Sequence, residues 1–155
     1  MSVNRKSNPK KDKYVVDLKQ LQALCTRNYA LLLRLLPLQY NLGQNWEVEL
    51  DNGLYFELRV LEISAYTERF ELVQKRHNLP SLFNMEIEFR VYHDAQMLEV
   101  ISYQKHTRIR ANNPYPNPNL HHKDEKLQIN LLLKDWLNLA IDKQTSRQGH
   151  SVLSA

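Results

Sequence analysis

The chain has 155 residues, of which 43% are hydrophobic and 25% are charged. This length and composition are typical of a single soluble domain with one hydrophobic core. No apolar run approaches the roughly 20 residues that span a bilayer, and no apolar signal segment follows the polar, basic first residues. We therefore expect a cytoplasmic protein that does not enter a membrane.

The net charge of +4 comes from one end of the chain. Residues 1–13 carry five basic side chains and one acidic side chain, whereas the remainder is balanced. Nucleic-acid-binding domains usually carry their basic excess on the fold itself, so nucleic acid is not an expected partner. We predict a basic disordered tail over residues 1–16, a single domain over 17–143 and a frayed tail over 144–155.

A first helix is predicted over residues 17–36. Asp17 can cap its start, and Pro37 ends it. The buried stripe is marked by leucines at spacings of three and four, and Cys25 lies among them as an expected small core residue. Because the chain has one cysteine, an intrachain disulfide is excluded.

The hydrophobic period changes to two after Trp46, which predicts strands. Two strands, about 46–50 and 54–60, flank the hairpin signal Asp51-Asn52-Gly53. A slip in the alternation at Val60-Leu61 predicts a bulge or bend, and a third strand is expected over about 67–76.

The fourth and fifth strands are predicted as a hairpin around residues 93–96. The fourth strand, 83–91, should place Phe83 and the alternate residues after it on one apolar face. The register sets Arg90 opposite Glu99 as a cross-strand ion pair. It also puts Tyr92 and Tyr103 on one face. Stacking on nucleic-acid bases is one role for such a pair, but we favour core or rim tyrosines.

A proline-rich connector at 112–119 leads to a last helix that begins between His121 and Asp124 and ends near residue 143. The predicted fold is therefore α+β with two layers. An antiparallel meander sheet of about five strands is packed on one face by an N-terminal and a C-terminal helix, and its other face is at least partly open.

Two clusters of titratable residues are candidates for chemistry. One is the hairpin turn and the other is the start of the last helix; their candidate catalytic residues are His93, Asp94, His121, Asp124 and Glu125. A histidine beside a carboxylate can act as a general base. No established metal-ligand spacing is present, so no metal is predicted. The alternative is structural, with a turn at His93-Asp94 and capping residues at the helix start.

A second pattern is the absence of acidic residues between Glu99 and Asp124. Basic side chains in that window, near a helix N-terminus, favour binding of a phosphate or carboxylate group. The candidate ligand-binding residues are Arg90, Arg108, Arg110, Tyr115, His121 and Lys126. The alternative is an exposed basic strand edge that prevents aggregation.

The runs YHDAQMLEV (92–100) and YPNPNLHHKDEKLQINLLLKDWL (115–137), with LPSL (79–82) and NYALLLRLLP (28–37), resemble the YqiB-like family of small bacterial proteins. The resemblance covers most of residues 17–141 and implies a cytoplasmic bacterial protein. It implies no reaction, and it ranks His122 below His121 as a site residue.

Three functions follow as hypotheses. The first is a non-enzymatic binding module for an anionic small molecule or an acidic protein segment. The second is a hydrolase-like enzyme that uses histidine and carboxylate acid–base or metal chemistry. The third is a protein that docks a partner or self-associates through the open sheet face. The sequence specifies neither a cofactor nor an oligomeric state.

Overall fold

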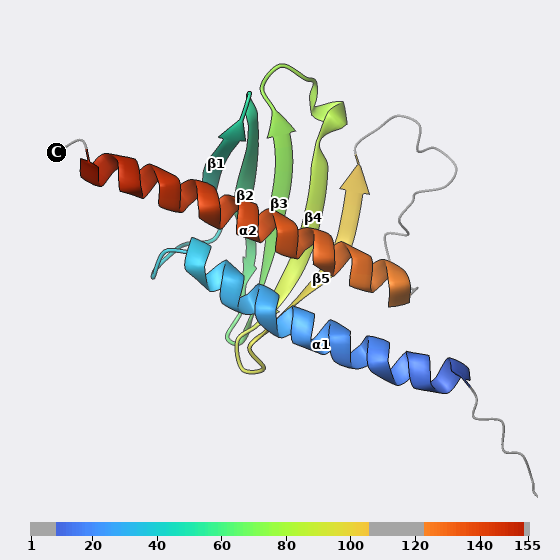
Figure 1. The fold of residues 1–155 in the computed structure, drawn as a ribbon. Coiled ribbons are helices and arrows are strands. Elements are labelled where there is room, and N and C mark those ends of the chain that lie inside the picture. The colour runs from blue at the N-terminus through green and yellow to red at the C-terminus, as the bar shows by residue number, and fades with distance from the viewer. Residues whose placement is uncertain (1–8, 106–122, 154–155) are drawn as a thin grey trace, which may run out of the picture.

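The computed structural model describes residues 9–105 and 123–153 and confirms the predicted α+β fold. Five antiparallel strands form one sheet in the order β1-β2-β3-β4-β5, and both helices cross the same face of it (Figure 1). The elements in chain order are α1 (Pro9–Leu35), β1 (Asn45–Asp51), β2 (Leu54–Ile63), β3 (Thr67–Arg76), the 3₁₀ turn η1 (Ser81–Phe83), β4 (Met85–Tyr92), β5 (Met97–Lys105) and α2 (Lys123–Leu153).

Both helices are longer than the sequence pattern predicts. α1 begins at Pro9, so Asp17 lies inside the helix and the prediction that it caps the start is wrong. Proline is favoured in the first helical turn, and neither glycine nor a second proline interrupts residues 10–16. The predicted end is confirmed, because the helix stops at Leu35, two residues before Pro37. At the other end of the chain, α2 continues ten residues past the predicted end, to Leu153.

The first hairpin forms as predicted. Asn52 and Gly53 both have positive φ angles, 50° and 78°, which is the type I′ arrangement that a two-residue hairpin favours. The predicted irregularity in β2 is also confirmed, because the register with β3 shifts between Val60 and Glu62. The residue between them, Leu61, is the extra residue of a β-bulge.

The β4–β5 hairpin has the predicted register near its turn, with Val91 opposite Leu98 and Phe89 opposite Val100. The register then shifts, so that Glu88 pairs with Ser102 and Ile101 is the extra residue. This bulge turns Tyr103 onto the core face, where it is 7% exposed. The prediction that Tyr92 and Tyr103 share a face is therefore wrong, and no stacking platform forms from the pair.

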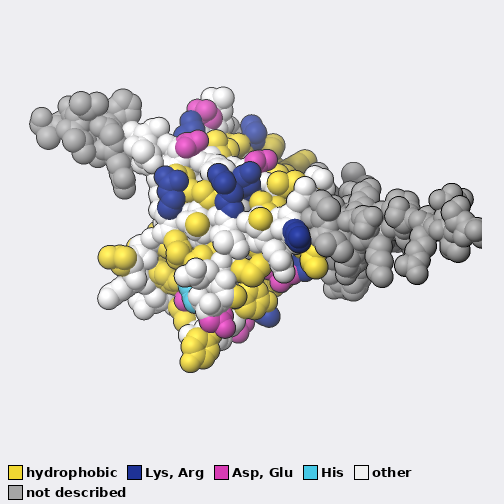
Figure 2. All heavy atoms as spheres, turned by 60° about the horizontal axis from the view of Figure 1, so that its bottom comes forward, with side chains coloured by type: hydrophobic (Ala, Val, Ile, Leu, Met, Phe, Trp, Pro, Cys, Tyr) yellow, Lys and Arg dark blue, Asp and Glu magenta, His cyan; other side chains and the backbone are white. Residues whose placement is uncertain are grey.

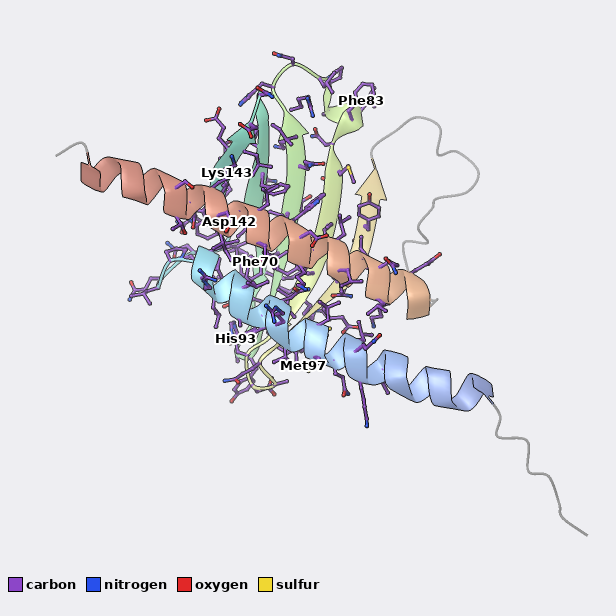
Figure 3. The ribbon with its side chains drawn as sticks, in the orientation of Figure 1. Phe70, Phe83, His93, Met97, Asp142 and Lys143 are labelled. Carbon is purple, nitrogen blue, oxygen red and sulfur yellow. The ribbon has the colours of Figure 1, made fainter. Side chains whose placement is uncertain are left out.

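Phe83 is also placed differently from the prediction. Pro80 begins a 3₁₀ turn in which the backbone N–H of Phe83 donates to the Pro80 carbonyl at 3.1 Å. The strand therefore begins at Met85, and the Phe83 side chain is 58% exposed. Figure 3 shows it at the end of the sheet opposite the hairpin that carries His93.

The core lies between the sheet and the two helices. Strand residues on the covered face contact the apolar stripe of α2 that the sequence predicts; Trp136, for example, packs on Phe56 with ring centroids 5.0 Å apart. The largest fully buried side chains are Phe56, Phe70, Phe89, Leu32, Leu72, Ile87, Leu98, Leu133 and Leu137. Burial of this apolar surface is the main stabilising contribution to the fold.

Candidate functional site

The described residues contain a pocket of about 260 Å³ beside the edge strand β5. Its walls come from the N-terminal half of α1, the β4–β5 hairpin and the first turns of α2. Figure 3 shows Met97 of this hairpin close to α1. The lining residues are Leu18, Leu21, Gln22, Cys25, Tyr92, Ala95, Met97, Glu99 and Lys126. We call this cavity the edge pocket.

The wall of the edge pocket is largely apolar. Leu18 remains 44% exposed although it belongs to the stripe of α1 that the sequence predicts to be buried. An exposed leucine by itself is ordinary, but here it borders a hollow that other apolar side chains also line. Such concave apolar walls with a few polar groups are typical of small-molecule sites.

The charged groups of the edge pocket are Glu99 and Lys126, which form an ion pair across the gap between β5 and α2. Both side chains are 31% exposed, so the pair is reached by solvent. The backbone register places Arg90 opposite Glu99 as predicted, but these two described side chains form no ion pair. The reason is that Lys126 reaches Glu99 from the helix layer, which the strand pattern could not reveal.

Cys25 forms part of the same wall and is only 4% exposed. Burial raises the pKa of its thiol, although the Lys126 ammonium acts in the opposite direction. A thiol in this state is a weak nucleophile. The prediction that Cys25 is a small buried residue is therefore confirmed.

Two buried asparagines hold the three walls together behind this region. Asn28 of α1 donates from Nδ2 to the Asn130 backbone carbonyl of α2 at 2.9 Å. The Asn130 side chain accepts from the backbone N–H of Val100 at 3.2 Å and donates to the Lys126 carbonyl at 2.8 Å. Both asparagines have no exposed surface, so they join α1, α2 and β5 where water does not reach them. Asn28 Oδ1 has no partner among the described residues.

His93 belongs to a second cluster at the same end of the sheet. Its Nδ1 lies 3.1 Å from the Tyr29 hydroxyl of α1, and its Nε2 lies 3.3 Å from Glu68 Oε2 of β3. Tyr40, in the link after α1, donates its hydroxyl to the same Glu68 oxygen. Burial, followed by the hydrogen bond to Glu68, raises the pKa of Tyr40 well above its ordinary value.

The sequence predicted a different carboxylate partner for His93. Asp94 does not orient His93. The Oδ1 atom of Asp94 accepts a hydrogen bond from the backbone N–H of Ala95 at 2.9 Å, as the structural alternative of a turn expects. Glu68 was not predicted as the partner of His93, because a charged residue at the start of a strand is expected to face solvent. Both ring nitrogens of His93 are already engaged, which is typical of a histidine that ties structure together.

Several predicted site residues fall outside the described part of the chain. Arg108, Arg110, Tyr115 and His121 lie between residues 106 and 122, and the side chain of Asp124 is likewise not described. Of the other candidates, Lys126 lines the edge pocket, whereas Arg90 does not. Glu125 is partly buried at the start of α2, and its Oε2 atom has no partner among the described residues.

Neither a metal centre nor a membrane span is found in the described residues. No group of three or more histidine, cysteine, aspartate or glutamate side chains there is placed to hold a metal ion. Neither described helix combines the length and the apolar character needed to cross a membrane.

Comparison with known proteins identifies relatives over most of the chain. The family model described as "Protein of unknown function (DUF1249)" matches residues 31–146. The chain is 34% identical over 129 residues to "Uncharacterized protein YqiB" of Escherichia coli strain K12. The aligned region covers 83% of this chain and 91% of that protein. The protein with the same name from Escherichia coli O157:H7 matches to the same extent. No solved structure matches.

Proposed function

Because the chain belongs to the DUF1249 family of proteins of unknown function, we propose its role from its own geometry: a non-enzymatic module that binds a small amphipathic anion in the edge pocket. The observation that carries the proposal is the composition of this pocket. It combines a continuous apolar wall with one ammonium group, on Lys126, at a place that solvent reaches.

The wall determines the body of the ligand. Leu21, Cys25 and Met97 offer it mainly carbon and sulfur atoms, so an alkyl or aryl group gains from leaving water there. The volume of about 260 Å³ lies just below the roughly 300 to 1,000 Å³ usual for ligand pockets. A compact ligand with a short chain or a single ring therefore fits this size.

The ion pair determines the charged group of the ligand. Lys126 carries three N–H donors and can pair with a carboxylate or a phosphate. These donors face Glu99 in the ion pair, so an incoming anion competes with that carboxylate. Removing the charge of Glu99 should consequently strengthen anion binding, whereas removing the charge of Lys126 should weaken it.

Catalysis has less support from the described residues than binding. A general base needs a free nitrogen, but His93 has Tyr29 at one ring nitrogen and Glu68 at the other. Cys25 has a raised pKa and little exposure, which does not suit a nucleophile. The hydrolase alternative therefore depends on His121 and Asp124, which the described side chains do not include.

The proposal can be tested with straight-chain carboxylates of six to twelve carbons and alkylammonium ions of the same lengths. Isothermal titration calorimetry should show binding of the carboxylates that tightens about fourfold per CH₂ until the pocket is full, because burial of each CH₂ contributes about 0.8 kcal/mol. Glu99→Gln should tighten this binding and Lys126→Met should weaken it. The alkylammonium ions should bind more weakly at every length.

Matched tryptophan substitutions in α1 separate the pocket from the rest of the surface. Leu21→Trp fills the edge pocket and should abolish carboxylate binding. Leu33→Trp adds the same side chain at a position that is 48% exposed and away from the pocket, so binding should persist. Equal binding by the two variants, or an equal affinity for carboxylate and ammonium ions, would overturn the proposal.

A further inference from the structure

The uncovered face of the sheet is acidic. Strands β1 to β4 alternate between core residues and residues that point away from the helices, and the second set is rich in charge. The glutamates on this face are Glu47, Glu49, Glu57, Glu62, Glu71, Glu86 and Glu88, and the basic residues are Arg59, Arg69, Lys75 and Arg90. We call this surface the acidic face.

Three of the basic side chains on the acidic face are already paired with glutamates. Glu57, which is 6% exposed, accepts from Arg59 and from Lys75, both at 2.7 Å. Arg69 contacts two further carboxylates, Glu88 at 2.5 Å and Glu62 at 3.2 Å. These contacts join three glutamates to three basic side chains, and the face as a whole carries seven glutamates against four basic residues.

The surroundings of Glu71 on the acidic face include other carboxyl groups, among them Glu86. The two residues lie on neighbouring strands, with Glu71 opposite Glu88 and Glu86 opposite Val73. Burial, together with Glu86, raises the pKa of Glu71 to about 7, with Arg59 acting in the opposite direction. Two carboxyl groups this close gain from a nearby cation, which stabilises both in the ionised form.

The same chain carries a segment of complementary charge. Residues 1–13 contain Arg5, Lys6, Lys10, Lys11 and Lys13 with a single acidic residue, Asp12. This segment leads into α1, which lies on the opposite side of the sheet and runs past the β5 edge at its N-terminal end (Figure 1). The described start of the segment, from Pro9 onward, belongs to α1 on the helix side of the sheet, which favours contact with the acidic face of another molecule.

We propose that the acidic face binds the basic segment (residues 1–13) of a second copy of this chain. The contact is head to tail, since the segment of one copy occupies the sheet of the next. Each exposed ion pair contributes at most about 1 kcal/mol, so the association is weak and reversible. It also weakens with salt, because the Debye length falls from about 10 Å at 0.1 M to about 3 Å at 1 M.

The helix layer of a second copy is the competing occupant. Lys19, Arg27 and Arg34 lie on α1, and Figure 2 shows Lys and Arg side chains in a band across this layer. The basic segment is the better match because its five basic residues stand close together in the sequence, between Arg5 and Lys13, whereas the three on α1 are spread from Lys19 to Arg34. The competing contact predicts that changes in residues 1–13 have no effect on association.

Sedimentation equilibrium of the full chain at pH 8 tests the proposal. In 0.05 M NaCl the mean mass should rise with protein concentration, and in 0.5 M NaCl it should stay that of a monomer. Arg5→Glu with Lys6→Glu, or Glu47→Lys with Glu49→Lys, should each lower the association constant about tenfold or more, because both replace attraction with repulsion. All four changes combined should restore it.

The control reverses charge elsewhere. Asp135→Lys with Asp142→Lys makes the same charge change at two exposed positions of α2, away from the acidic face, and should not weaken association. Circular dichroism and thermal melting establish that every variant is folded. Three results would each overturn the proposal: a monomer at every concentration in low salt, association unaffected by the segment variant, or no recovery in the combined variant.

Discussion

Replacement of Asn130 by alanine should destabilise the protein by about 2 to 3 kcal/mol. The change removes the acceptor for the Val100 N–H, in a buried bond, and the donor to the Lys126 carbonyl, in a partly buried one. A buried N–H left without a partner costs about 1 to 3 kcal/mol, and the second hydrogen bond contributes about 1 kcal/mol. Alanine recovers about 0.5 kcal/mol through its higher helix propensity.

Urea unfolding followed by circular dichroism measures this change, because the free energy of unfolding extrapolates linearly to water. Gln128→Ala is the matched control, since Gln128 is an exposed amide side chain on the same helix. Its effect should remain within about 0.5 kcal/mol. The melting temperature of Asn130→Ala should fall by about 5 to 10 °C. A loss below about 1 kcal/mol would refute the view that this residue joins α2 to the edge strand.

Further predictions concern single groups. Glu71→Gln should reduce the loss of stability that accompanies a rise in pH from 5 to 7.5. The pKa of Glu71 is about 7 in the folded protein against 4.5 in the unfolded chain, so its carboxyl group favours folding at low pH. This contribution, about 1 kcal/mol after allowance for partial exposure, is lost as the pH rises through that window. Tyr40→Phe should cost about 1 to 2 kcal/mol in urea unfolding because Glu68 loses a donor, whereas Tyr66→Phe, at a side chain that is 70% exposed, should be neutral. Cys25 should react with iodoacetamide at least about 100-fold more slowly in the folded protein than in 8 M urea, since burial raises its pKa.

Each of these predictions has a clear contrary result. An unchanged pH profile in Glu71→Gln would show that the pKa of Glu71 is not raised in the folded protein. Equal effects of the two tyrosine substitutions would show that the Glu68 contact contributes nothing to stability. Fast alkylation of the folded protein would show that the wall around Cys25 opens readily to solvent.

The local features of the sheet could be predicted where one residue type has few structural options. Asn52 and Gly53 tolerate positive φ angles, so the hairpin followed from the sequence. The alternation from Met85 to Val91 set the register of β4 against β5 near the turn. It could not reveal the bulge at Ile101, because one extra residue leaves no mark in the pattern yet moves every later side chain to the other face.

The candidate site was predicted only in part. Lys126 was predicted from its charge, and it lines the edge pocket. The leucines of α1 were expected in the core, because periodicity shows which face of a helix is apolar but not what covers that face. Asn28 could have been noticed as an amide between Cys25 and Leu32 on the buried stripe. Its partner Asn130 is 102 residues away, and no local pattern joins the two.

A methyl NMR titration of the full chain with decanoate locates the ligand on the protein. Ligand in the edge pocket should shift the methyl signals of Leu18, Leu21 and Met97, which line it. The signals of Leu79 and Leu82, which are similarly exposed but lie near η1 and outside the pocket, should not move. Shifts confined to Leu79 and Leu82, or no shift at any of the five methyl-bearing residues, would contradict binding in the edge pocket.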